Sequence, residues 1–198
     1  MAVHLNKKIF PLFLWLLKAG ALPNLFFLVQ TFRYPLNTAA PQALLPARIL
    51  FLVSAYRCLF PVRYKDLVVF HDSPFSSIFA TRFLATFSEI DLIYQLSYVL
   101  RAANHAQVAW VDLLSWVMVI QVVVSQFFVW GSILTGKLLL FLYEEIGWAI
   151  IYGINTFASI YLYAKPAQEE KLAPLLVLNI LFGIVYLPWQ YFHLRSLH

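Results

Sequence analysis

One stretch of the sequence, Phe75 to Arg101, limits most strongly what this chain can fold into. It is long and apolar enough to cross a bilayer, yet Arg82, Glu89 and Asp91 lie inside it. An ionised side chain near the centre of a bilayer costs about 2.5–3.5 kcal/mol on insertion scales. Three such side chains in one span therefore need partners or a wet cavity, and we expect their neighbours to decide the function.

The composition is typical of a membrane protein. Of the 198 residues, 62% are hydrophobic and 12% are charged, and the mean hydropathy is +0.77. A soluble domain carries about 25% charged residues. Because each span uses about 20 residues, the chain has room for about five or six crossings with short connections and for no soluble domain. We predict an all-α, polytopic integral membrane helical bundle that forms a single membrane domain over residues 1–198.

The N-terminal part, residues 1–43, gives a mixed signal. Gly20 and Pro23 interrupt the apolar run Ile9–Val29, and proline removes a backbone donor and disfavours helix just before it. Two structures remain open for this run, either one kinked span or two half-helices that lie in the membrane interface. The following segment, Gln30–Pro46, is rich in proline and is predicted to be a loop.

Residues 44–198 are predicted to form the helical bundle itself. The span that carries Arg82 is expected to begin at Pro74, with Asp72 or Ser73 as its N-cap. The polar segment Pro61–Asp72 connects it to the span before it. The other expected spans are Leu44–Phe60, Trp110–Ile133, Leu138–Ala164 and Pro174–Leu194, the last broken at Pro188, with connections at Arg101–Ala109, Gly131–Lys137 and Lys165–Lys171.

Polar residues recur along one face of the central span. Arg82, Thr86 and Glu89 are separated by four and three residues, so they share a helical face. Arg82 and Glu89 are two turns apart, about 10 Å along the axis, and a direct pair between them is expected to be stretched. We therefore expect another element to supply the closer partner of Arg82.

A second span offers that partner. If the runs from Ser76, Trp110 and Leu138 are successive crossings, the first and the third are parallel. Arg82 and Glu144 then lie at about 9 Å below the same surface, so we predict an ion pair of Arg82 with Glu144 or Glu145. This pair is either a structural clip or part of a site. The predicted intramembrane polar cluster comprises Arg82, Thr86, Glu89, Asp91, Glu144, Glu145 and Asn155.

Two further groups of residues surround this cluster in the prediction. The rim above it is formed by His71, Asp72 and Ser73. Basic side chains near the ends of spans extend toward lipid headgroups, and the candidates are Arg48, Arg57, Arg63 and Lys65. A bound phospholipid and the surrounding membrane lipids are therefore the expected ligands.

Other classes of site find little support in the sequence. The single cysteine, Cys58, excludes an internal disulfide and a cysteine-rich metal site. The histidines are scattered, and no pair has the spacing that places two metal ligands on one helical face. No glycine-rich phosphate loop occurs. The basic residues are dispersed rather than clustered. We therefore predict no metal, no other cofactor and no nucleic-acid partner.

Two resemblances bear on the function. Tyr98–Gln107, followed by a span that carries glutamates, is similar to the proton-channel subunit a of ATP synthases, which has an Arg and an Asn on one membrane helix. In that family the Asn follows the Arg by four residues, whereas Asn104 follows Arg101 by three and falls in an expected turn.

The second resemblance covers about 77 residues. The pattern resembles that of an uncharacterised group of polytopic membrane proteins, and it implies the membrane fold but no activity. This chain has the apolar Leu138–Tyr143 where more polar residues would be expected in that group. The residues that carry the pattern are Asp72-Ser73, Ser76-Ser77, Arg82, Ala85-Thr86, Glu89, Thr135 and Glu144-Glu145-x-x-Trp148.

Three functions follow as hypotheses. The first is a structural or accessory subunit of a larger membrane complex, of the energy-transducing respiratory or ATP synthase type, in the mitochondrial inner membrane. The second is a small integral-membrane enzyme acting on a lipid or other apolar substrate, with Glu89, Glu144 or Glu145 as acid or base and Arg82 as an anion clamp. The third is a proton path along the same carboxylates. For the first hypothesis, the partners are other membrane subunits.

Overall fold

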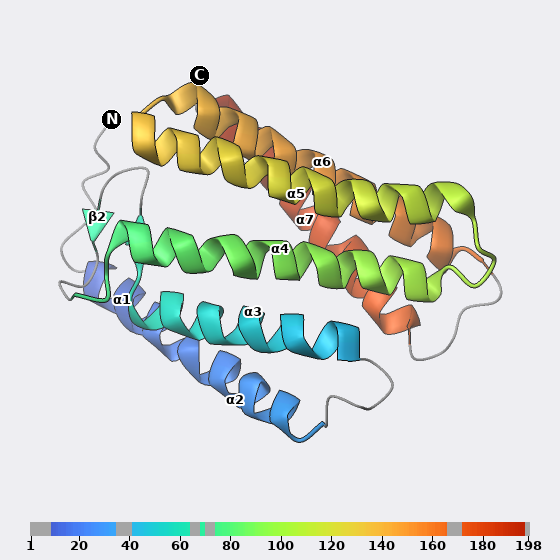
Figure 1. The fold of residues 1–198 in the computed structure, drawn as a ribbon, viewed down its shortest axis with the longest axis horizontal. Coiled ribbons are helices and arrows are strands. Elements are labelled where there is room, and N and C mark those ends of the chain that lie inside the picture. Colours follow the sequence, from blue (N-terminus) through green and yellow to red (C-terminus); the bar gives the residue numbers. More distant parts are fainter. Residues whose placement is uncertain (1–8, 35–40, 64–67, 70–73, 166–171, 197–198) are drawn as a thin grey trace. The chain divides into compact units, whose positions relative to one another are not determined.

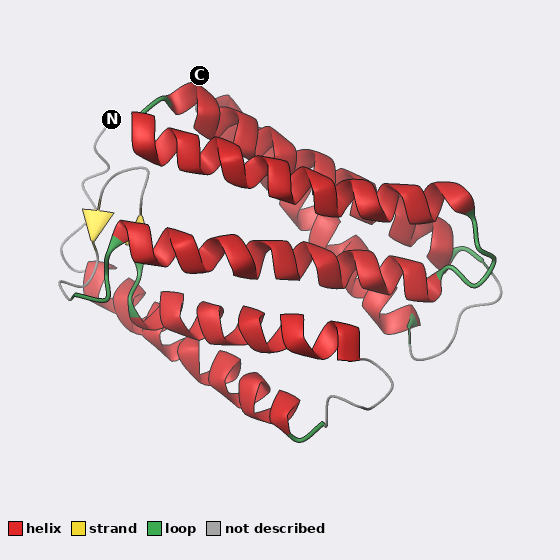
Figure 2. Ribbon diagram, viewed as in Figure 1, coloured by secondary structure: helices red, strands yellow, loops and turns green. Residues whose placement is uncertain are grey.

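The computed structural model describes residues 9–34, 41–63, 68–69, 74–165 and 172–196, and almost all of them are helical (Figures 1 and 2). This confirms the predicted all-α polytopic membrane fold. The elements are α1 (Ile9–Ala19), α2 (Ala21–Phe32), α3 (Pro41–Leu59), β1 (Val62–Arg63), β2 (Val68–Val69), α4 (Ile78–Ala103), α5 (Ala109–Thr135), α6 (Leu138–Tyr163) and α7 (Ala173–Ser196).

Five helical segments in the described part of the chain are long and apolar enough to cross a membrane. They are Leu14–Phe32, which runs through α1 and α2, Gln42–Leu59 in α3, and the whole of α5, α6 and α7. Helix α4 has 26 residues and is about 39 Å long, which also suffices to cross. It is not among the five because its charged residues lower its hydropathy.

The chain divides into two compact units, residues 1–91 and residues 92–198. The boundary falls inside α4, so the first part of that helix belongs to one unit and the rest to the other. The predicted single membrane domain stays a prediction. The two units are described separately below.

In the first unit, Gly20 joins α1 to α2 without an intervening loop. Its backbone is helical, with φ −60° and ψ −18°, and its N–H donates to the carbonyl of Leu16 at 3.0 Å. Pro23 has no N–H to continue the ladder, and the Asn24 side chain donates to the Gly20 carbonyl at 2.7 Å. This geometry agrees with one interrupted span rather than with two half-helices separated by a turn.

Helix α3 begins at Pro41, three residues before the predicted start at Leu44, so the prediction that Gln30–Pro46 is all loop was wrong at both ends. Proline is tolerated at the first helical position because its missing N–H would have no helical partner there. Pro46 also lies inside α3. The composition of this segment therefore resembles a loop although much of it is helical.

The predicted connection Pro61–Asp72 contains a short antiparallel pair of strands. Val62 pairs with Val69 and Arg63 with Val68. The sequence pattern does not predict these strands, although valine is a favourable strand residue. Helix α4 then begins at Ile78, not at Pro74, and the side chain of Ser77 accepts a hydrogen bond from the Ala80 N–H at 3.4 Å. Ser77 therefore takes the N-cap position that the sequence pattern had assigned to Asp72 or Ser73.

In the second unit, short turns join successive helices. Asn104 organises the turn between α4 and α5, since its side chain accepts from the Val108 N–H and donates to the Val108 carbonyl, both at 3.0 Å. Gly136 ends α5 with φ +68°, a left-handed conformation that glycine adopts at no steric cost. With only Gly136 and Lys137 between them, α5 and α6 are antiparallel neighbours, as predicted.

Helix α7 packs against α6 and continues through Pro188 to Ser196, so the predicted break at Pro188 was wrong. The two helices are in close contact at Gly183, where a Cβ atom would overlap the side chain of Thr156. Small residues let membrane helices come close enough for their backbones and side chains to interlock. The α6–α7 pair provides most of the side chains for the site described next.

Candidate functional site

The charges of α4 form an ion pair within the helix. Both terminal nitrogens of Arg82 donate to Glu89, with Nη1 at 3.0 Å from Oε1 and Nη2 at 2.7 Å from Oε2. The Arg82 side chain is only 3% exposed and that of Glu89 14%. Bidentate pairs of this kind are among the strongest charge-assisted hydrogen bonds in proteins. The guanidinium and the carboxylate therefore neutralise each other inside the unit.

The expectation that this pair would be stretched was wrong. Residues seven positions apart lie on nearly the same helical face, displaced by only about 20°. Both side chains are long, and together they cover the two turns between their backbones. The prediction considered only the rise along the axis and left out the reach of the side chains.

A third charge from α3 lies beside this pair. Nη1 of Arg57 is 3.6 Å from Oε1 of Glu89, and the Arg57 side chain is 43% exposed. Glu89 thus faces two guanidinium groups, one buried and one near the surface of the unit. Thr86, also placed in the cluster, donates its hydroxyl to the Arg82 carbonyl at 3.1 Å. Arg82, Thr86 and Glu89 are therefore brought together as predicted.

The rest of the predicted cluster is distributed over both units. Asp91 lies at the end of the first unit, and Glu144, Glu145 and Asn155 lie in α6 of the second. The pairing of Arg82 with Glu144 or Glu145 stays a prediction, because its members belong to different units. Glu144 is buried, with 2% of its surface exposed.

Glu145 has its own partners in α7. Its side-chain Oε2 accepts from Gln190 Nε2 at 2.7 Å, and the same nitrogen donates to the Glu145 carbonyl at 2.8 Å. Nε2 of His193 lies 3.6 Å from Oε1 of Glu145, and the imidazole ring of His193 stacks on Trp189. The sequence pattern did not indicate Gln190 or His193 as site residues. The signal that could have identified them is that they are two polar residues one helical turn apart near the end of the last span.

Asn155 belongs to a second polar group, which the sequence analysis found only in part. Asn179 Nδ2 donates to Asn155 Oδ1 at 3.3 Å and to Ser159 Oγ at 3.4 Å. All three residues are buried. Asn179 is a polar residue in an apolar stretch of α7, and that isolation was the signal that could have identified it.

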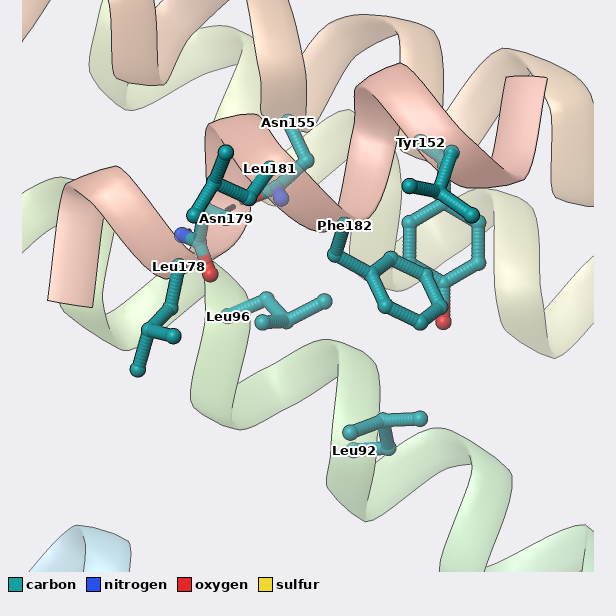
Figure 3. Close-up of a pocket in the computed structure, with 9 residues that line it drawn as sticks. Leu92, Leu96, Tyr152, Asn155, Leu178, Asn179, Leu181 and Phe182 are labelled. Atoms are coloured by element: carbon teal, nitrogen blue, oxygen red, sulfur yellow. Dashed lines mark hydrogen bonds between the residues drawn. The ribbon is translucent and has the colours of Figure 1, made fainter. Parts of the chain in front are cut away.

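A cavity of about 560 Å³ opens beside these two asparagines (Figure 3). Its walls come from the second part of α4, from α6 and from α7, all within the second unit. Three of its lining residues carry polar side-chain atoms, namely Tyr152, Asn155 and Asn179, and the others are Leu92, Leu96, Leu178, Leu181, Phe182 and Val185. The cavity is therefore apolar with a small polar patch, as is usual for sites that bind small apolar molecules.

The predicted rim and headgroup residues are covered only in part. His71, Asp72, Ser73 and Lys65 lie outside the described residues, as does the side chain of Arg63. Arg48 donates to the carbonyls of Thr31 at 2.9 Å and Tyr34 at 3.2 Å, at the end of α2. It thereby satisfies helix-end carbonyls, and contact of Arg48 and Arg57 with headgroups stays a prediction.

No three histidine, cysteine or acidic side chains come together in a metal-binding arrangement within the described residues. Chemically, the described part therefore offers a neutralised ion pair, a Glu145–His193 contact and an apolar cavity with an amide patch. Comparison with models of protein families, with curated proteins and with solved structures gives no significant match to this chain.

Proposed function

We propose that this chain is a structural or accessory subunit of a larger membrane complex, of the energy-transducing type, rather than an enzyme. The observation that carries the proposal is the bidentate pair of Arg82 and Glu89. An acid or base needs a pKa near the working pH and access to a substrate. A carboxylate whose two oxygens both accept hydrogen bonds from one guanidinium offers little access to a substrate, so this pair serves to keep charged side chains inside a membrane helix.

The cavity supports the same proposal. Its polar side chains are two amides and a phenol, none of which exchanges a proton readily at neutral pH. Such a lining can bind and orient a molecule. Among the described residues, those that line the cavity supply no carboxylate, imidazole or amine that would act as a general acid or base.

The first unit presents an aromatic and aliphatic surface that suits a neighbouring protein or lipid. Along α1 and α2, large apolar side chains are more than half exposed, among them Trp15 at 70%, Leu22 at 69% and Phe32 at 64%. Aromatic residues are enriched at protein interfaces and at the edges of membranes. A neighbouring subunit is the partner that the proposal requires here.

The test is the composition of the particle in which the protein migrates. Native membranes from cells that carry a tagged copy are dissolved in mild detergent, and the tagged chain is purified and analysed on a native gel and by mass spectrometry. We expect it to migrate with other membrane proteins in a fixed ratio, far above its own 22.9 kDa. A monomer that turns over a lipid would contradict the proposal.

The alternative, a small membrane enzyme, is favoured by one observation, the contact between Glu145 and His193. A carboxylate beside an imidazole is a common acid–base arrangement, and His193 is partly exposed. For this alternative, Glu145→Gln and His193→Gln should each abolish turnover of a lipid substrate. Glu89→Gln is the matched control. It should leave turnover unchanged if Glu145 and His193 act as acid and base, and it should abolish turnover if the enzyme uses the Arg82–Glu89 pair of α4 instead.

A further inference from the structure

The cavity of the second unit is polar at one end and apolar at the other. Asn155 and Asn179 face each other across α6 and α7 (Figure 3). Phe182 and Val185 follow one and two turns farther along α7, and Tyr152 lies one turn back along α6. Leu92 and Leu96 of α4 line the cavity in the same direction. From Leu178 to Val185 the cavity follows α7 for about 10 Å.

The polar end lies toward one membrane surface. Asn155 is eight residues before the end of α6, and Asn179 is six residues after the start of α7. At 1.5 Å per residue both lie about 9–12 Å from those helix ends, which meet the same surface because α6 and α7 are antiparallel. The two amides are thus in the outer part of a hydrocarbon core that is about 30 Å thick, and the apolar end lies deeper.

The two amides retain unused hydrogen-bonding capacity. Asn155 is 1% exposed and Asn179 is 8% exposed. Asn179 uses its Nδ2 for Asn155 and Ser159. Within the described part of the chain, the Asn155 Nδ2 and the Asn179 Oδ1 make no hydrogen bond. The amide nitrogen of Asn155 is a hydrogen-bond donor beside the cavity, and an ester carbonyl oxygen would be a suitable acceptor for it.

Water is a poor occupant for the remainder of the cavity. An internal water needs two to four polar partners, and leucine, phenylalanine and valine line the walls away from the amides. The bilayer around α6 and α7 supplies hydrocarbon at high concentration. A flexible chain can fill an irregular apolar space that water would leave empty.

We infer that this cavity binds one acyl chain of a membrane phospholipid. The ester carbonyl of the chain accepts a hydrogen bond from Asn155 Nδ2 at the polar end, and its hydrocarbon tail extends past Phe182 and Tyr152. The inference does not depend on whether the protein is a subunit or an enzyme. It concerns a lipid held in place between helices, in addition to the headgroup contacts predicted from the sequence.

The test uses a phosphatidylcholine with a photoactivatable diazirine in the middle of one acyl chain, added to vesicles that contain the full-length protein. After illumination, labelled peptides are identified by mass spectrometry. We expect the labelled residues to be those that line the cavity, such as Leu92, Tyr152 and Phe182. Labelling that is equally strong on Ile184, a residue of α7 that does not line the cavity, would overturn the inference.

Two variants of α7 form a matched pair for this test. Leu181 lines the cavity and is 54% exposed, whereas Ile184 is on the same helix, does not line the cavity and is 58% exposed. Leu181→Trp should reduce labelling of the cavity segments at least fivefold, and Ile184→Trp should leave it unchanged. Equal labelling in Leu181→Trp and in the unaltered protein would overturn the inference.

Two further experiments test whether a free fatty acid or a neighbouring protein occupies the cavity instead. A free fatty acid with the same diazirine should label the cavity less than the phospholipid does, and stronger labelling by the fatty acid would contradict a phospholipid site. In native membranes, a diazirine amino acid placed at Leu96 should cross-link to lipid. A cross-link to another protein instead would show that a neighbouring subunit fills the cavity and would overturn the inference.

Discussion

Arg82 and Glu89 lie two helical turns apart on α4 and hold each other through two parallel hydrogen bonds of 3.0 and 2.7 Å. Two full charges on one membrane helix therefore act nearly as one neutral group. The pair explains how an otherwise apolar helix tolerates an arginine that is only 3% exposed. Because of this pairing, replacing one of the two residues should destabilise the protein more than replacing both.

We expect Arg82→Leu to lower the free energy of unfolding by about 3 kcal/mol, because it removes the bidentate partner of the Glu89 carboxylate, whose side chain is only 14% exposed. The double variant Arg82→Leu with Glu89→Leu should recover most of this loss. Unfolding measured in mixed micelles of increasing denaturing detergent gives both values. Arg57→Gln is the control, and should cost no more than about 1 kcal/mol because Arg57 is largely exposed. Additive effects of the two leucine substitutions would contradict a direct interaction.

The turn between α4 and α5 should depend on Asn104. Its side chain bonds both backbone groups of Val108 and also donates to Asp112 Oδ1 at 2.9 Å. Asn104→Ala should therefore cost about 1–2 kcal/mol, a magnitude typical of a lost cap. Gln107, the residue before the N-cap of α5 at Val108, has φ +47°, so Gln107→Gly should be neutral or stabilising. The same unfolding assay compares the two, and a more harmful Gln107→Gly would contradict this account of the turn.

Close packing of α6 on α7 should make Gly183 sensitive to a single added methyl group. A Cβ at this position would overlap the Thr156 side chain, and overpacking of this kind costs about 1–3 kcal/mol. Gly153 is the matched control, because a Cβ there meets nothing within 4 Å. Gly153→Ala should stabilise α6 by about 0.5–1 kcal/mol through its higher helix propensity. Thermal aggregation of purified protein ranks the two variants, and a stable Gly183→Ala would show that Thr156 can move away.

Gln190 should matter more than its position near the end of α7 suggests. Its side-chain nitrogen bonds both the backbone and the carboxylate of Glu145. Gln190→Leu keeps the volume but removes both bonds, and we expect a loss of about 1–3 kcal/mol. Tyr191→Leu, at the exposed neighbouring position, is the control. The prediction is wrong if the two variants unfold at the same detergent fraction.

The crossings themselves can be tested by cysteine labelling in sealed vesicles, in a Cys58→Ser background. Single cysteines are introduced at Ala106, between α4 and α5, at Lys137, between α5 and α6, and at Lys165, after α6. The cysteines at positions 106 and 165 should be labelled from one side of the membrane, and the cysteine at position 137 from the other. This pattern follows if α5 and α6 each cross once. Labelling of all three from the same side would mean that the α5–α6 hairpin lies on the surface of the membrane.

The helices of the second unit could be predicted closely from sequence. Leu138–Ala164 was expected and Leu138–Tyr163 was found, because a glycine turn and a polar loop mark both ends of an apolar run. The starts of α3 and α4 were missed, since Pro41 resembles a loop residue and Ser77 competes with the more obvious cap signal at Asp72 and Ser73. In both helices the first residue depends on local backbone geometry, and several neighbouring residues are compatible with a helix start.

The site was less predictable than the fold. Arg82, Thr86 and Glu89 were placed on one face correctly, because helical periodicity alone determines that. Asn179 and Gln190 depend on how α7 is rotated about its axis against α6, and apolar residues all round α7 leave that rotation unspecified. The cavity has the same origin, since its volume results from the packing of three helices.

The two-residue connection of Gly136 and Lys137 also constrains how the protein is made. With only two residues between their ends, α5 and α6 cannot move far apart, so we expect them to insert into the bilayer as a helical hairpin. Gln121 and Ser125 of α5 lie against Gly147 of α6, and these polar side chains therefore enter the membrane already facing a helix instead of lipid. The turn at Gly136 and Lys137 therefore bears both on how α5 and α6 enter the membrane and on how they pack in the folded protein.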